Sequence, residues 1–143
     1  MSNSPRGILA YGYDLGGMDS GLKFSTSNNT NIDFIDVEKA ERIILAQIVN
    51  FTETWETRTD DQFWSRFEEA KKKLGIRFVC YCSYDYPSYI IATQVFEAID
   101  WGSTPVKPHL DHSAYERLQR ACGILGIVPN EPEPSWILAS FYG

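Results

Sequence analysis

The residues best suited to binding or catalysis are tyrosines and acids at the expected ends of strands. Asp14 follows Tyr13 at the end of the first apolar segment. Asp85 stands between Tyr84 and Tyr86 in a turn that contains a proline. Tyrosine provides a large contact area at low entropy cost, and carboxylates favour a cationic partner. If these two strand ends meet in space, they form one acidic, aromatic binding surface.

The expected binding surface is made of aromatic and acidic residues from three segments: Tyr11, Tyr13, Asp14, Tyr84, Asp85, Tyr86 and Trp136. An alternative interpretation is structural. The rings would then be core or half-buried sheet residues, and the two aspartates would be turn formers. The sequence alone leaves both interpretations open.

The two histidines of the chain, His109 and His112, lie on either side of Asp111. Imidazole and carboxylate side chains can ligate a metal or transfer protons. Three ligands within four residues are unusual for a metal site, because ligands generally come from elements that converge. We therefore favour the interpretation that Asp111 and Ser113 cap a helix, and we expect no bound metal.

Other catalytic patterns are weak. Gly16 and Gly17 follow a strand but lack the lysine and the immediate helix of a phosphate-binding loop. Cys82 and Ser83 are possible nucleophiles, but the sequence indicates no base beside them. We expect no cofactor and no catalytic residues, so the sequence favours a protein without enzymatic activity. The alternative is a small enzyme or small-ligand binder with a cleft of carboxylates and tyrosines, including Tyr13, Asp14, Asp85 and His112.

Length and composition predict one domain spanning residues 1–143. The chain is 43% hydrophobic and 14% aromatic, with a net charge of -6. This acidic balance argues against nucleic acid as a partner, and no apolar run reaches the roughly 20 residues of a membrane helix. The three cysteines, Cys80, Cys82 and Cys122, are interpreted as reduced core residues of an intracellular protein.

The periodicity of apolar residues predicts an α+β fold with the element order β-α-α-β-β-α-β. We expect a single four-stranded mixed or antiparallel sheet covered by about three helices, with a long loop over 16–32. The expected strands are 7–13, 76–83, 89–97 and 136–141, and the first and last are expected to be neighbours. The expected helices are 37–50, 59–74 and 113–125, with caps at Asp36, Thr59 and Ser113 and stops at Gly75 and Gly126.

The segment RGILAYGYDLGG at 6–17 resembles the opening of a family of small uncharacterised proteins of actinobacterial phages and their hosts. The segments YCSYDYP at 81–87 and PSWILASFYG at 134–143 are also similar to that family. The resemblance implies a phage or prophage accessory protein in the cytoplasm of a bacterial host. We therefore expect a binding protein that engages a host protein, and a homodimer is possible through an edge strand.

Overall fold

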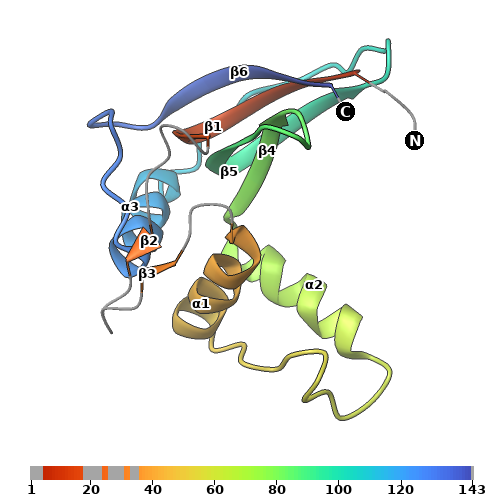
Figure 1. The fold of residues 1–143 in the computed structure, drawn as a ribbon, viewed down its shortest axis with the longest axis vertical. Coiled ribbons are helices and arrows are strands. Elements are labelled where there is room, and N and C mark those ends of the chain that lie inside the picture. Colours follow the sequence, from red (N-terminus) through yellow and green to blue (C-terminus); the bar gives the residue numbers. More distant parts are fainter. Residues whose placement is uncertain (1–4, 18–23, 26–30, 33–35, 143) are drawn as a thin grey trace.

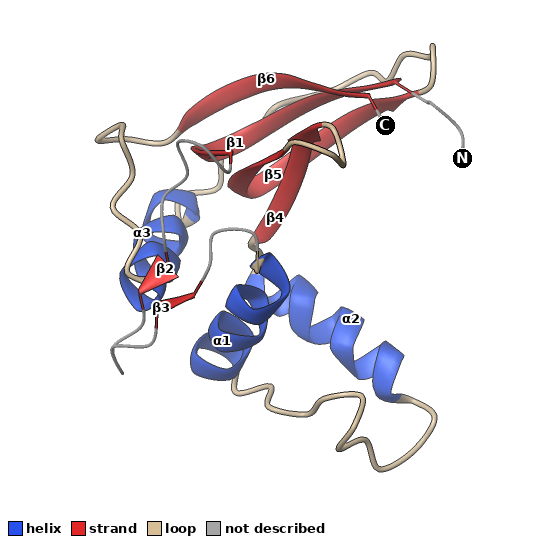
Figure 2. Cartoon of the chain, viewed as in Figure 1, coloured by secondary structure: helices blue, strands red, loops and turns tan. Residues whose placement is uncertain are grey.

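The computed structural model describes residues 5–17, 24–25, 31–32 and 36–142 (Figure 1). The strands are β1 (Pro5–Gly17), β2 (Phe24–Ser25), β3 (Asn31–Ile32), β4 (Arg77–Cys82), β5 (Pro87–Ile99) and β6 (Ser135–Tyr142). The helices are α1 (Val37–Val49), α2 (Phe63–Leu74) and α3 (Ala114–Leu125) (Figure 2). With the short pair β2–β3 set aside, this is the predicted β-α-α-β-β-α-β order.

The four long strands form one mixed sheet, as predicted, and the sheet closes into a barrel with the order β1-β5-β4-β6. β1 pairs antiparallel with β5 on one side and with β6 on the other. The predicted pairing of the first and last strands is therefore confirmed. β4 pairs with the first half of β5 and meets β6 at a single parallel pair, Cys82 with Phe141.

Side chains of β1 alternate between the barrel interior and the face that carries the helices, as the pleat of a strand requires. Ile8 and Ala10 are fully buried inside the barrel, whereas Tyr11 and Tyr13 pack on the helical side. The pairing of β1 with β5 is irregular between Asp14 and Gly16, where Leu15 has no partner. Such a bulge bends a strand and changes the direction in which its side chains point.

Helix α1 begins where the sequence predicts. The carboxylate of Asp36 accepts a hydrogen bond from the backbone N–H of Lys39 at 3.1 Å, and Ala40, Ile44 and Leu45 form the buried stripe. This carboxylate satisfies one of the backbone donors that a helix leaves free at its first turn.

The capping boxes predicted for the other two helices are wrong. α2 begins at Phe63, and the carboxylate of Asp60 accepts from the Gln62 N–H at 2.8 Å. Ser113 is the N-cap of α3, as predicted, but it makes no side-chain capping bond; the carboxylate of Asp111 instead accepts from the Ser113 N–H at 2.9 Å. In both cases an aspartate two residues upstream forms a local turn, which competes with the capping geometry.

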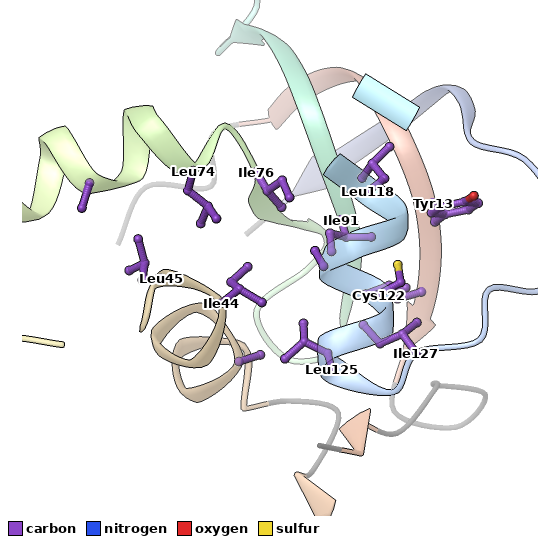
Figure 3. Packing of buried hydrophobic residues seen from close by; sticks show 14 residues of the cluster. Tyr13, Ile44, Leu45, Leu74, Ile76, Ile91, Leu118, Cys122, Leu125 and Ile127 are labelled. Atoms are coloured by element: carbon purple, nitrogen blue, oxygen red, sulfur yellow. The ribbon is translucent and has the colours of Figure 1, made fainter. Parts of the chain in front are cut away.

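The larger core cluster lies between the helices and the sheet (Figure 3). Leu118 and Leu125 of α3, Ile44 of α1 and Ile91 of β5 are each completely buried there. Burying one such side chain contributes about 1.5–3 kcal/mol. A second cluster fills the barrel interior and contains Ile8, Ala10, Val79, Ile90, Ala92 and Phe141.

The cysteines occupy three different environments. Cys122 is buried in the larger cluster, and burial raises the pKa of its thiol to about 11. Cys80 is half-buried, but Cys82 is exposed, so the prediction of a core cysteine is wrong at that position. Cys82 is the last residue of β4, where it pairs with Pro87 of β5 and has a φ of 75°.

The predicted long loop over 16–32 lies mostly outside the described residues. Gly16 and Gly17 belong to β1, and residues 24–25 pair antiparallel with 31–32, so this segment contains strands that the sequence did not predict. None of the described helices combines the length and apolar character needed to cross a membrane.

Candidate functional site

The carboxylate of Asp14 is held by two neighbours at the end of β1. The hydroxyl of Tyr81 donates to its Oδ1 and Oδ2 at 2.8 and 2.9 Å. The backbone N–H of Gly16 donates to Oδ1 at 2.9 Å, across the bulge at Leu15. Asp14 is itself exposed, so its carboxylate is fixed in orientation and still open to a partner.

Tyr81 acts as a hydrogen-bond donor at neutral pH. Burial and the hydrogen bond to the Asp14 carboxylate together raise the pKa of this phenol to about 12. A phenol with so high a pKa keeps its proton near pH 7, since the ionised form would be both poorly solvated and beside a negative charge. The pair is thus arranged for recognition more than for proton transfer near neutrality.

The end of β1 lies beside the β4–β5 hairpin, because Gly17 pairs with Ser88 and Tyr81 pairs with the same residue from the other side. Gly17 at the end of β1 therefore lies next to the proline-containing turn, whereas Asp14 pairs with Ile90 further along β5. We call the turn residues Tyr84, Asp85 and Tyr86 the hairpin tip.

The rings of the hairpin tip face solvent. Tyr84 is 67% exposed and Tyr86 is 75% exposed. Tyr84 packs edge-on against Phe141 with ring centroids 4.7 Å apart, and the Tyr86 N–H donates to the Ser83 hydroxyl at 3.1 Å. These contacts give the tip a defined shape while most of both rings stays uncovered.

A cavity of about 510 Å³ opens where β4 approaches β6. It is lined by Asp14, Tyr81, Cys82 and residues 137–140, and we call it the mouth cavity. Its apolar wall comes from Ile137, Leu138 and Ala139. The cavity extends from the Asp14 carboxylate to β6. Phe141 of β6 packs against Tyr84 of the hairpin tip.

Tyr13 does not lie on this surface, and its predicted placement there is wrong. It is 2% exposed and sits alongside α3, near Cys122 (Figure 3). The Gln119 amide donates to its hydroxyl at 2.6 Å, and burial raises the pKa of the phenol. The cause is the alternation of a strand, which turns adjacent residues to opposite faces.

Tyr11 and Trp136 also lie on the helical side of β1 and are not brought to Asp14. Their rings meet edge-on at 5.3 Å, and Trp136 also stacks with Phe96 at 6.2 Å. Both are partly buried, so these two residues fit the structural interpretation that the sequence left open. Of the seven predicted site residues, Asp14 lines the mouth cavity, and Tyr84, Asp85 and Tyr86 are exposed at the hairpin tip.

The histidines are not drawn into the mouth cavity. The backbone carbonyl of His109 accepts a hydrogen bond from the Gln94 side chain, which pairs across from Tyr11 on the helical side. Asp111 is engaged by the Ser113 N–H and, at 3.1 Å, by Arg117. Among the described residues, no group of three or more His, Cys, Asp or Glu side chains could hold a metal ion.

Sequence reasoning missed two features. The first is Tyr81, whose pairing with Asp14 depends on a fold that no local spacing reveals. The second is the aromatic cluster around Trp55 and Trp64, which the sequence analysis does not predict. The signal that could have found it is the density of rings in residues 51–67, which holds five of the chain's aromatic residues.

Comparisons of the chain with protein-family models, with curated proteins and with solved structures found no match.

Proposed function

We propose that the chain is a non-enzymatic binding protein that engages a host protein through the hairpin tip and the mouth cavity. The observation that carries this proposal is the exposure of Tyr84 and Tyr86 on either side of Asp85. Exposed tyrosines that cluster with acids are typical of interface anchors. The resemblance of the strand ends to phage proteins supports an accessory role in a bacterial host cytoplasm.

The charge and the lining of this surface favour a partner that carries both basic and apolar side chains. The carboxylates of Asp14 and Asp85 supply negative charge, and the chain as a whole carries a net charge of -6. Ile137, Leu138 and Ala139 supply an apolar wall in the mouth cavity. The Tyr84 ring, held against Phe141, also loses little side-chain entropy on binding, which favours affinity.

The test is a comparative capture experiment from an actinobacterial host lysate. The immobilised proteins are the wild type, the double variant Tyr84→Ala/Tyr86→Ala, and the control Trp101→Ala. Trp101 is 88% exposed but lies after β5, outside the hairpin tip. We expect a protein that the wild type and the control retain and that the double variant loses about tenfold or more, as measured by mass spectrometry.

Equal retention by all three proteins would show that the hairpin tip is not the binding surface. Circular dichroism of the double variant provides the folding control, since both rings are largely exposed and their removal should leave the core intact.

A second candidate function is small-ligand binding in the mouth cavity. The observation that favours it is the cavity volume of about 510 Å³ beside a fixed carboxylate, which is within the ordinary range for ligand sites. The test is a thermal-shift screen of small organic amines against the wild type and Asp14→Asn. Saturable stabilisation that Asp14→Asn abolishes would support this function, and stabilisation unchanged in the variant would refute it.

A further inference from the structure

A second surface rich in aromatic rings lies where α1 and α2 meet, at the end of the molecule away from the barrel strands (Figure 1). Phe63 is its centre, 3% exposed, with the rings of four neighbours 5.0 to 6.1 Å away. Those neighbours are Phe51, Trp55, Trp64 and Phe67. Trp55 and Trp64 stack at 5.5 Å and remain 44% and 55% exposed.

These rings line a cavity of about 240 Å³, which we call the helix groove. Its apolar lining includes Leu45 and Ala46 of α1. The charged side chains around it are Glu38, Glu41, Arg42, Glu53 and Glu56. Four carboxylates and one guanidinium line the groove itself, and Arg58, Arg66 and Lys71 lie against its margin.

One of these carboxylates already has a structural role. The guanidinium of Arg66 donates to both oxygens of Glu53, at 2.6 and 2.9 Å, and to Asp60 at 2.9 Å. This network ties the segment between the helices to α2. In the part of the chain that the structure describes, Glu38, Glu41 and Glu56 form no ion pair within 4.0 Å.

Glu41 is the most informative of the three. It lies on α1, and burial raises the pKa of its carboxyl. An ionised group in such a place gains from a nearby cation, because the cation replaces part of the lost solvation. The helix groove therefore combines apolar walls with a poorly solvated negative charge.

The rings of this cluster already bind cations at its margin. The guanidinium carbon of Arg58 lies 3.5 Å from the centre of the Trp55 ring, and the Lys71 ammonium lies 5.3 Å from that of Phe67. Cation–π attraction is strongest for tryptophan. The volume of about 240 Å³ is below the usual range for small-molecule pockets and suits one long side chain.

We propose that the helix groove binds an arginine side chain from a basic segment of a partner protein. Arginine is favoured over lysine because its planar, weakly hydrated guanidinium both stacks on indole rings and pairs with carboxylates through two hydrogen bonds. The site lies on α1, α2 and the segment between them, so it is independent of the hairpin tip.

The experiment uses the four indole N–H signals of the full chain, from Trp55, Trp64, Trp101 and Trp136, followed by NMR. The probe is a short synthetic peptide of alanine and leucine with one central arginine. Its control is the same peptide with citrulline, a neutral isostere of arginine. We expect the Trp55 and Trp64 signals to shift saturably and the citrulline peptide to bind at least about fivefold more weakly.

Two variants locate the site. Trp64→Ala removes an exposed wall of the groove, and Glu41→Gln removes the half-buried charge without changing the shape. Each should weaken arginine-peptide binding severalfold, whereas the matched controls Trp101→Ala and Glu133→Gln should not. Because Glu41→Gln is isosteric, it tests the proposal even if Trp64→Ala disturbs the helices.

Equal affinity for the arginine and citrulline peptides would overturn the proposal, because the groove would then be a purely apolar contact. Equal affinity for a lysine version would overturn the choice of arginine. Shifts as large at Trp101 as at Trp64 would show that the peptide binds without reference to the groove.

Discussion

The hydroxyl of Tyr81 lies 2.8 Å from Oδ1 of Asp14, a residue 67 positions away in the chain. β5 separates their two strands in the sheet, so this hydrogen bond spans the barrel mouth from β1 to β4 without any backbone pairing between them. It is the link that fixes the carboxylate of the mouth cavity.

Tyr81→Phe should remove this link and lower the free energy of unfolding by about 1 kcal/mol, since Asp14 remains exposed and can turn to water. Tyr142→Phe is the matched control, because that ring is 55% exposed near the end of β6. Urea unfolding of both variants measures the difference. A Tyr81→Phe protein as stable as the control would show that the bond adds nothing to the fold.

The same pair predicts a dependence of stability on alkaline pH. The native pKa of Tyr81 is raised from 10.0 to about 12, so the folded state retains the proton that the unfolded state loses. This contribution is complete below pH 10 and is lost as the pH rises toward about 12. Unfolding curves across that window should fall more steeply for the wild type than for Tyr81→Phe.

Two leucines test the assignment of the core. Leu118 is completely buried in α3, whereas Leu138 is 82% exposed on β6. Leu118→Ala should reduce the free energy of unfolding by about 2–5 kcal/mol, because it leaves a cavity as well as losing burial. Leu138→Ala should change it by less than about 0.5 kcal/mol. Similar losses for the two variants, measured by chemical denaturation, would contradict the described packing.

Two glycines test the closeness of β1 to β5. A Cβ on Gly12 would lie 1.8 Å from the backbone oxygen of Ile91, whereas a Cβ on Gly123 of α3 would meet nothing within 4 Å. Gly12→Ala should therefore lower the free energy of unfolding by at least about 3 kcal/mol or prevent folding. Gly123→Ala should stabilise by about 0.5–1 kcal/mol through helix propensity. Thermal unfolding of the pair makes the comparison, and tolerance of Gly12→Ala would contradict the register of this ladder.

Glu41 on α1 predicts a pH effect of the same sign, but in the acidic range. Its pKa is raised from 4.5 by burial, so the folded state favours the protonated carboxyl, and stability falls as the pH rises above 4.5. Glu41→Gln should thus be more stable than the wild type near pH 7, and this difference should vanish below pH 4.5. Glu133→Gln, in the exposed bend before β6, is the control for a surface carboxylate. Calorimetric unfolding at several pH values measures the effect, and a difference independent of pH would refute it.

Local patterns were enough to predict most of the fold. The periodicity after Asp36 gave α1, and the glycines at 75 and 126 end α2 and α3 with φ of 66° and 68°, the left-handed geometry that favours glycine. The likeness of the first and last strands also led to a correct pairing. In each case the information lies within a few residues, where propensity and periodicity act.

The site was harder to predict because it depends on geometry between distant segments. Tyr13 and Asp14 are adjacent in sequence, yet strand alternation sends one to the helices and the other to the barrel mouth. The partnership of Asp14 with Tyr81 requires the sheet to curl, and curling depends on accumulated twist and bulges. The helix groove likewise arises only when Phe51 and Trp55 fold back on α2.

The barrel is held by long ladders at three of its four interfaces and by one pair, Cys82 with Phe141, at the fourth. The β4–β6 junction therefore has the fewest backbone pairs of the four interfaces. Parting β4 from β6 would break this one backbone pair and the packing of Phe141 with Tyr84 and Val79, while the three long ladders stay intact.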